Sequence, residues 1–174
     1  MCASPVITKL ETADSAMSDA EWEMRVDLAA CYRLVAHYDM DDLFATHISA
    51  RAPGADEHFL LNPYGMHFSE ITASSLVKVD LDGNIVQDTE HVINPAGFVI
   101  HSAIHAARHD AKCVMHTHTV AGMAIASMEE GLQPWFQKAT RYYNTVAYHD
   151  FEGVADDLDE RDRLVQDLGD KDYL

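Results

Sequence analysis

Residues 111–119, Ala-Lys-Cys-Val-Met-His-Thr-His-Thr, constrain the fold of this chain more than any other stretch. Their first half is rich in β-branched and sulfur-containing side chains and follows a helical pattern, so we expect a buried strand. His116 and His118 stand two apart near its end. Because side chains alternate between the faces of a strand, both would point the same way, with Cα atoms about 6.5–7 Å apart. Two imidazoles at that spacing can share one metal ion at about 2.0–2.1 Å each.

The opposite face of the same strand is expected to pack into the core. It carries Cys113, Met115 and Thr117. An ordinary alternative is a pair of partly exposed histidines at a strand end, which is the more common outcome for an isolated His-x-His pair. The choice between the two depends on the rest of the chain.

Composition excludes several classes of function. A chain of 174 residues that is 48% hydrophobic suits one globular domain with a real core. Acidic residues outnumber basic ones by 29 to 12, so the net charge of −17 argues against nucleic-acid and membrane partners. Three cysteines without metal-type spacing, Cys2, Cys31 and Cys113, favour a reducing, cytoplasmic location. No signal sequence is recognised, and no apolar run is long enough to span a bilayer.

The order of patterns predicts a mixed, largely antiparallel sheet covered by helices. Residues 1–17 lack periodicity and are expected to form a flexible tail, whereas residues 18–174 form the domain. Ser18 and Glu21 form a capping box that starts a helix with an apolar stripe. We expect helices at 18–38, 98–108, 120–128 and 157–168, and strands at 45–51, 59–61, 76–81, 85–86, 111–119 and 145–148. Another strand begins near 172, where the chain ends. The helix at 120–128 is rich in small residues and is expected to pack closely on its neighbours.

Three histidines lie four residues apart on the helix at 98–108 and just beyond it. His101, His105 and His109 would therefore share one face, which could bind a metal. Ile100, Ile104 and Ala107 supply the apolar face of this helix. We expect His105 and His109 to face solvent, and leave open whether His101 packs or ligates.

Two further pairs are candidates for substrate binding. His47 and Ser49 share one face of their strand. Tyr64 and Gly65 occupy a turn whose backbone can approach a ligand. Ordinary sheet and turn chemistry would explain either pair equally well.

Taken together, these stretches resemble the class II aldolase/adducin family, and most closely its adducin-head branch. The resemblance covers residues 22–174. It is carried by His47-Ile48-Ser49-Ala50-Arg51, by Leu61-Asn62-Pro63-Tyr64-Gly65, by Phe68-Ser69-Glu70-Ile71-Thr72, by Val79-Asp80-Leu81-Asp82-Gly83, and most strongly by the run from Ala96 to Asp110 with His116-Thr117-His118-Thr119.

The resemblance implies a three-layer α/β/α sandwich around a mostly antiparallel sheet, assembled as a tetramer with sites between subunits. Aldolases of this family hold zinc with three histidines, of which His116 and His118 match two. The zinc acts as a Lewis acid on a substrate carbonyl, and a glutamate moves the proton.

Three departures from the family pattern stand out. The position of the glutamate is Gly97, which cannot move a proton. The elements that cradle a sugar phosphate in the aldolases align with Thr46-His47 and Pro95-Ala96. The third histidine belongs to a strand that would continue past Leu174, so the domain is expected to be incomplete at its C-terminus.

Two functions follow as hypotheses. The first is a divalent-metal site, of the zinc type by the family pattern, with lyase-like chemistry on a small oxygenated carbon substrate. There a metal-bound hydroxide, His47 or Tyr64 would serve as base, and Asp150 or Glu152 could supply a third ligand. The alternative is a non-catalytic module like the adducin head, which mediates self-association and cytoskeletal protein contacts.

Overall fold

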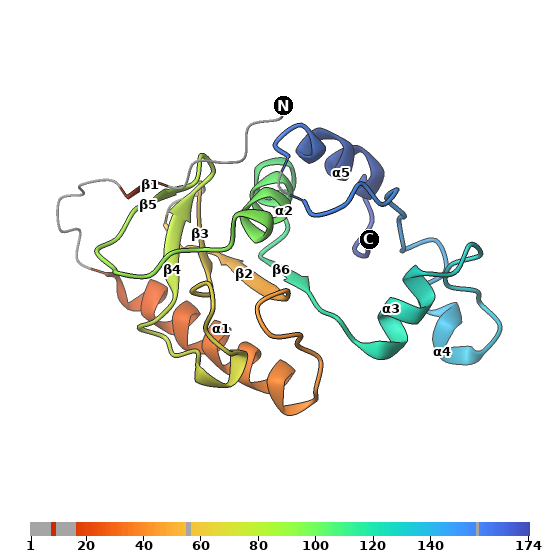
Figure 1. Ribbon diagram of the computed structural model, residues 1–174, viewed down its shortest axis with the longest axis horizontal. Coiled ribbons are helices and arrows are strands. Elements are labelled where there is room, and N and C mark those ends of the chain that lie inside the picture. The colour runs from red at the N-terminus through yellow and green to blue at the C-terminus, as the bar shows by residue number, and fades with distance from the viewer. Residues whose placement is uncertain (1–7, 10–16, 55–56, 156) are drawn as a thin grey trace.

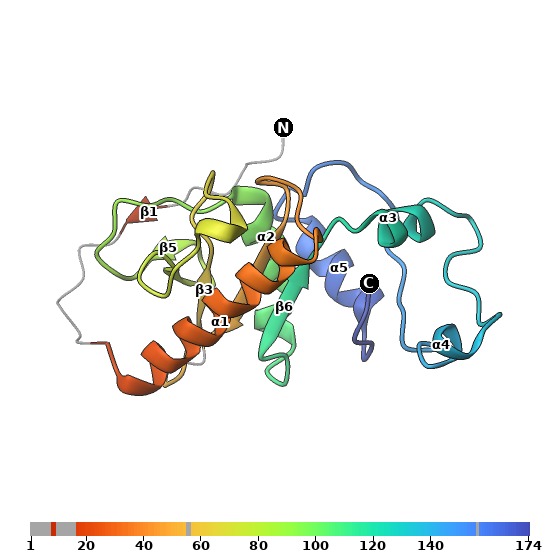
Figure 2. The same cartoon turned by 90° about the horizontal axis from the view of Figure 1, so that it is seen from below.

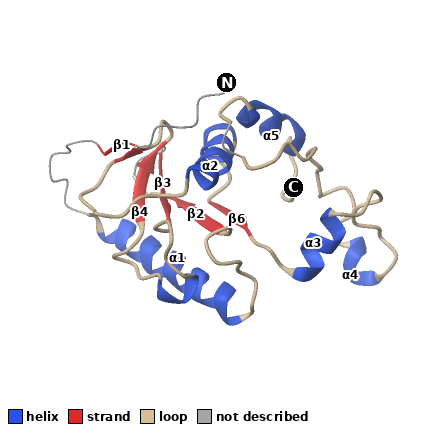
Figure 3. Ribbon diagram, in the orientation of Figure 1, coloured by secondary structure: helices blue, strands red, loops and turns tan. Residues whose placement is uncertain are grey.

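A computed structural model describes residues 8–9, 17–54, 57–155 and 157–174. Its centre is a six-stranded sheet in the order β1-β5-β4-β3-β2-β6 (Figures 1 and 3). The strands are β1 (Thr8–Lys9), β2 (His47–Arg51), β3 (His58–Leu61), β4 (Val77–Asp80), β5 (Asn84–Ile85) and β6 (Cys113–His116). β1 runs parallel to β5, and the other neighbouring pairs are antiparallel. The flexible tail predicted at 1–17 lies outside the described residues except for β1 and Met17, and stays a prediction.

Helix α1 (Asp19–His37) covers one face of the sheet, and Figure 2 shows it lying across the strands. The Ser18 Oγ accepts a hydrogen bond of 3.2 Å from the backbone N–H of Glu21, so the predicted cap forms. The buried side of α1 meets the side chains that β2 and β3 point toward it, together with the 3₁₀ helix η1 (Phe68–Glu70). This core contains Leu28, Ala29, Tyr32, Val35, Ile48, Ala50, Ala52, Leu60, Phe68, Ile71 and Leu76.

Helix α2 (Pro95–Ala107) covers the opposite face, and α5 (Glu160–Leu168) packs against α2 (Figure 1). A second core lies between α2 and the sheet, formed by Phe59, Leu61, Val77, Val79, Ile85, Ile93 and Phe98. Alternate residues of β3 enter the two cores, as the period of a strand requires. The predicted three-layer α/β/α sandwich around a mostly antiparallel sheet is therefore confirmed.

The buried side of α2 differs from the prediction. Ile100 and Ile104 are only half-buried and Ala107 is exposed, whereas His101 and His105 are fully buried. The reason is that this side of α2 also faces the polar side of β2. The prediction that His105 faces solvent is wrong, whereas His109 is exposed as expected.

Strand β6 lies at the edge of the sheet and pairs with β2. Its predicted core face is wrong: Cys113 is exposed, Met115 is 48% exposed and Thr117 is half-buried. An edge strand has a neighbour on one side only, so its side chains are covered less than those of β2 or β3.

The segment between β6 and α5 lies to one side of the sheet in both views (Figures 1 and 2). It contains α3 (Val120–Ala126) and α4 (Gln137–Thr140). None of the α3 residues is buried, so the expected close packing of this small-residue helix is wrong. The strand predicted at 145–148 is reduced to an isolated parallel bridge between Val146 and Tyr173. In the described part of the chain no helix is long and apolar enough to cross a membrane.

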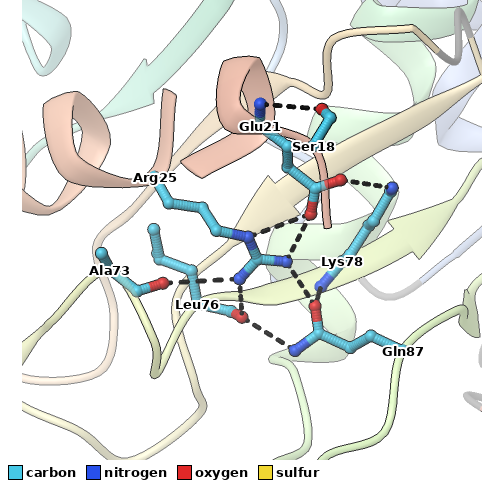
Figure 4. Close-up of polar contacts among 7 residues, drawn as sticks. All are labelled: Ser18, Glu21, Arg25, Ala73, Leu76, Lys78 and Gln87. Carbon is cyan, nitrogen blue, oxygen red and sulfur yellow. Dashed lines mark hydrogen bonds and ion pairs between the residues drawn. The ribbon is translucent and has the colours of Figure 1, made fainter. Parts of the chain in front are cut away.

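A buried ionic network ties α1 to β4 and to the segment that follows β5 (Figure 4). Arg25, whose side chain is 1% exposed, donates from Nε and Nη2 to the Glu21 carboxylate at 3.0 and 2.9 Å. Its Nη1 donates to the backbone carbonyl of Leu76 at 2.7 Å. Lys78 donates to the other Glu21 oxygen at 2.7 Å, and the amide group of Gln87 completes the cluster.

Candidate metal and proton-transfer site

His116 and His118 converge where β6 ends. Their Nε2 atoms lie 2.9 Å apart, and the ring planes make an angle of 72°. The backbone N–H of His118 donates to the carbonyl of Met40 at 3.3 Å, which holds the segment after β6 against the loop before β2. From that loop the Asp42 carboxylate lies 2.9 Å from the His118 Nδ1.

The donor chemistry of this pair fits a metal ion in part. Two nitrogens bound tetrahedrally to one zinc ion lie about 3.3 Å apart, close to the separation seen here. Burial, followed by the nearby His118, lowers the pKa of His116 to about 4, so its imidazole is neutral and can donate a lone pair. A carboxylate on the far nitrogen, as Asp42 supplies, is the usual support of a histidine ligand. However, the described residues contain no cluster of three histidine, cysteine or carboxylate side chains able to hold a metal.

A second set of polar side chains lies behind this pair, between β2 and α2. His47 and Ser49 point from β2 toward α2 and meet His101 and His105. His47 Nδ1 lies 2.7 Å from His101 Nε2, and the Ser49 Oγ lies 2.8 Å from His105 Nε2. The Ser49 Oγ also hydrogen-bonds His101 Nδ1. The result is a continuous chain from His105 through Ser49 and His101 to His47.

This chain reaches the paired histidines through His47. Its ring stacks on that of His116, with centroids 4.7 Å apart and planes within 14°. The two residues are direct partners in the β2–β6 ladder, which explains the stacking. Thus β2 links the paired histidines to α2.

The three histidines of this hydrogen-bond chain are neutral at pH 7. Burial lowers the pKa of His47 to about 3, with smaller contributions from His116 and His118. Burial also lowers the pKa of His101 well below its usual value, with His47 as the next contributor. For His105, burial and the nearby Arg51 guanidinium lower the pKa to about 4. Arg51 also donates to the backbone carbonyl of His105 at 2.6 Å.

Gly97 leaves the space that the His47 ring occupies. It lies in the first turn of α2, which Asn94 caps by accepting a hydrogen bond from the backbone N–H of Ala96 at 3.1 Å. A Cβ added at Gly97 would lie 3.0 Å from Cδ2 of His47 and 3.1 Å from its Cγ. The position that lacks a side chain is therefore filled by an imidazole from the neighbouring strand.

The other candidate residues lie apart from these histidines. Tyr64 and Gly65 form the predicted turn, with Gly65 at a φ of 83°. The Tyr64 ring packs edge-on against Phe44, and in the described structure neither residue contacts the histidines by hydrogen bond or ring stacking. Glu152 instead holds Arg163 in a two-point ion pair at 2.5 and 2.6 Å, and Asp150 is exposed.

Sequence reasoning missed Asp42 and the roles of His101 and His105. Asp42 lies 76 residues from His118 in a loop, and no periodic pattern marks it. His101 and His105 did carry a signal. Residues four apart on a helix and two apart on a strand both fix a face, so His101 and His105 could have been matched to His47 and Ser49.

A three-layer sandwich with a His-x-His pair at the end of a strand fits a class II aldolase-type domain. Residues 26–174 match the model of the Class II Aldolase and Adducin N-terminal domain. The chain belongs to this family.

Individual relatives include both proteins named for class 2 aldolases and adducins. The chain is 59% identical to a provisionally named aldolase class 2 protein of Caulobacter vibrioides, over 91% of this chain and 62% of that protein. It is 44% identical to alpha-adducin of Rattus norvegicus, over 95% of this chain and 23% of that protein.

Solved structures agree with these relatives. The crystal structure of an aldolase II superfamily protein from Pseudomonas syringae has a TM-score of 0.85 at 59% identity, over 88% of this chain and 62% of that one. L-Fuculose 1-phosphate aldolase from Glaciozyma antarctica has a TM-score of 0.78 at 27% identity, over 93% of this chain and 63% of that one. The chain thus spans less than two thirds of the length of each of these relatives.

Proposed function

We propose that this chain binds a divalent metal ion of the zinc type through His116 and His118 and supports lyase-like chemistry on a small oxygenated carbon substrate. The observation that carries the proposal is the 2.9 Å approach of the two Nε2 atoms, with Asp42 bound to the far nitrogen of His118. When bound, such an ion would polarise a substrate carbonyl as a Lewis acid. His116 and His118 would orient it on the side of the sheet where β6 ends, and Asp42 would fix the His118 ring.

His47 is the residue best placed to move a proton. It touches the His116 ring and fills the space beside Gly97, where the family glutamate would stand. Ser49 would act through His101 on the orientation of His47. The exposed Tyr64 lies apart, next to Phe44, and would serve with Gly65 in substrate contact only.

Metal titration tests the proposed ligands directly. Zinc should bind weakly to the unmodified chain, because two imidazoles fall short of the usual three protein ligands. His118→Ala should lower the zinc affinity by at least about 10-fold, and Asp42→Asn by about 10-fold through the loss of ligand orientation. His109→Ala is the matched control, since this exposed histidine lies outside the pair.

Competition against a chromophoric chelator at pH 7 measures these affinities. Equal losses of zinc affinity for His118→Ala and His109→Ala would mean that the histidines of α2 and just beyond it bind the metal, and would overturn the assignment.

Sugar-phosphate cleavage should be absent. Gly97 cannot act as the proton-transfer residue, and the positions of the phosphate cradle are Thr46-His47 and Pro95-Ala96, with Thr46 fully buried. We expect no detectable retro-aldol cleavage of a sugar 1-phosphate in the presence of added zinc. The assay couples the released triose phosphate to NADH oxidation, with an authentic L-fuculose 1-phosphate aldolase as positive control. Robust zinc-dependent cleavage would show that the proton-transfer residue has been assigned wrongly.

Self-association is the second part of the proposal. Segment 120–154 exposes many large apolar side chains, including Val120 at 82%, Trp135 at 78% and Phe151 at 94%. Exposed apolar surface of this kind marks contact sites. We infer a homo-oligomer, a tetramer by the family pattern, located in the cytoplasm.

A non-catalytic module like the adducin head is the second candidate function. It is favoured by the 44% identity to alpha-adducin over 95% of the chain and by the absence of an ionisable side chain at Gly97. The metal content of the purified protein separates the two candidates. A protein that takes up no zinc even after dialysis against millimolar zinc, which would fill a weak two-histidine site, and that still self-associates would support the module over the enzyme.

A further inference from the structure

The chain of hydrogen bonds from His105 to His47 is closed to solvent and has a countable number of protons. His101, His105 and Ser49 are fully buried, and His47 is 3% exposed. Each of the three links joins two atoms that can either donate or accept, so each link holds one hydrogen. A neutral imidazole carries one N–H, and a hydroxyl supplies one hydrogen.

These constraints leave two arrangements of the chain. In the first, His47 Nδ1–H donates to His101, His101 Nδ1–H donates to Ser49, and Ser49 O–H donates to His105 Nε2. His47 then has an unprotonated Nε2, and His105 carries its proton on Nδ1. In the second arrangement every donor becomes an acceptor, so His47 carries a proton on Nε2 and His105 has none on Nδ1. The two ends of the chain are therefore coupled.

The surroundings of His105 favour the first arrangement. The backbone at Ala111 interacts with His105 as a hydrogen-bond acceptor does and acts to raise its pKa, against the larger lowering by burial and by Arg51. Within the described structure the buried His105 Nδ1 has no hydrogen-bond partner, so the Ala111 backbone is near it without forming a hydrogen bond. A backbone carbonyl can only accept a hydrogen bond. Its oxygen beside Nδ1 therefore suits a protonated Nδ1, whereas an unprotonated Nδ1 would face it with a second lone pair.

We propose that Ser49, His101 and His105 are positioning residues that hold His47 as its Nδ1–H tautomer, so that an unprotonated Nε2 is presented beside His116. The use of this nitrogen, as the acceptor for a hydroxyl or C–H proton of the substrate, rests on the proposed function. The tautomer itself does not rest on that function, because the hydrogen bonds from His105 to His47 set it without any change of charge and without a metal.

Nitrogen NMR of the metal-free protein tests the tautomer. In protein labelled with ¹⁵N-histidine and kept in EDTA at pH 7, long-range ¹H–¹⁵N correlations distinguish protonated from unprotonated ring nitrogens. The His47 signals are assigned by their loss in His47→Gln. We expect the Nε2 of His47 to be unprotonated and its Nδ1 to carry the hydrogen. A protonated Nε2 in the unmodified chain would overturn the proposal.

Two serine variants show whether the chain sets this tautomer. Ser49→Ala removes the central link, so His47 should lose its single tautomer and show a mixture of both. Ser102→Ala is the matched control, because Ser102 is also buried but donates only to the backbone carbonyl of Val99 at 3.2 Å. Ser49→Thr, which keeps the hydroxyl, should restore the single tautomer.

An unchanged His47 signature in Ser49→Ala would contradict the positioning role. If that variant does not fold, the measurement on the unmodified chain still decides the tautomer. Neither experiment contains metal or substrate, so failure of zinc binding leaves this result standing, and the reverse also holds.

Discussion

Lowering the pH from 7 to 5 should reduce the free energy of unfolding of the metal-free protein by at least about 4 kcal/mol. The cause is the buried pair His101 and His105, which the unfolded chain protonates near pH 6.5. In the folded chain, burial followed by nearby charges lowers the pKa of His105 to about 4 and that of His101 well below its usual value. Between these limits His101 and His105 alone make the unfolded state bind two more protons than the native state. His47 and His116, with folded pKa values of about 3 and about 4, add to this difference.

The sign of the effect follows from that proton count. Stability is fully present above pH 6.5 and falls as the pH drops toward the folded pKa values, at about 1.4 kcal/mol per pH unit for each histidine. His47, whose pKa burial and the neighbouring His116 and His118 lower to about 3, acts in the same direction. A loss of this size is a large part of the roughly 5–15 kcal/mol that holds a domain together.

Urea unfolding in EDTA at several pH values from 7.5 to 4.6 measures the slope. His105→Gln should lower the slope by about 1.4 kcal/mol per pH unit, because one fewer proton is taken up on unfolding. His109→Gln, at an exposed position, is the matched control. Glu21 does not interfere: burial acts to raise its pKa, but Lys78 and Arg25 together lower it below 4.5, and its contribution is lost only below this range. Stability that stays level between pH 7 and 5 would contradict neutral, buried histidines.

The central strands were predictable because each signal was local. Hydrophobic alternation placed β2, β3 and β4 within a few residues of their bounds, and the turn at Asp82-Gly83 placed β5. Ser18 marked the start of α1 by the hydrogen bond that it makes. Period and turn chemistry determine such elements with little help from the rest of the molecule.

Burial was harder to predict, because it depends on what lies against an element. Met115 has the pattern of a core residue but lies on an edge strand, and the small residues of α3 find no buried contact. The reverse error occurred at His105, where a polar residue was assigned to solvent. It is buried because β2 offers Ser49 as its partner, and a buried polar group needs such a partner.

In the candidate site, too, some contacts could be predicted from local spacing and others could not. The spacing of two residues was enough to predict that His116 and His118 would converge, although β6 ends at His116 and a backbone hydrogen bond to Met40 helps to place His118. Asp42 could not be predicted, because its approach to His118 depends on how the loop before β2 folds back, with the Asp42 N–H donating to Thr46 at 3.1 Å. That loop has no period from which a contact can be inferred.

Replacing Arg25 with alanine should destabilise the domain by about 3–5 kcal/mol, the usual cost of removing one partner from a buried ion pair. The Glu21 carboxylate, whose side chain is 8% exposed, would keep Lys78 but lose both bonds from Arg25. The carbonyl of Leu76 would lose its donor at 2.7 Å and keep only the amide of Gln87 at 3.0 Å. Arg25 also fills the space between α1 and the sheet, so alanine would leave a cavity as well.

Guanidinium unfolding at pH 7 measures this loss, with Arg33→Ala as the matched control on the same helix. Arg33 is exposed and donates once, to the backbone carbonyl of Ile71 at 3.0 Å, so its removal should cost no more than about 1 kcal/mol. A double-mutant cycle with Glu21→Ala separates the ionic coupling from the packing. Strong coupling means that Arg25→Ala costs much less once Glu21 has been removed, because no buried carboxylate is left unpaired. Equal losses in the presence and absence of Glu21 would mean that Arg25 stabilises α1 by filling space and by its backbone contacts, and that the ion pair contributes nothing.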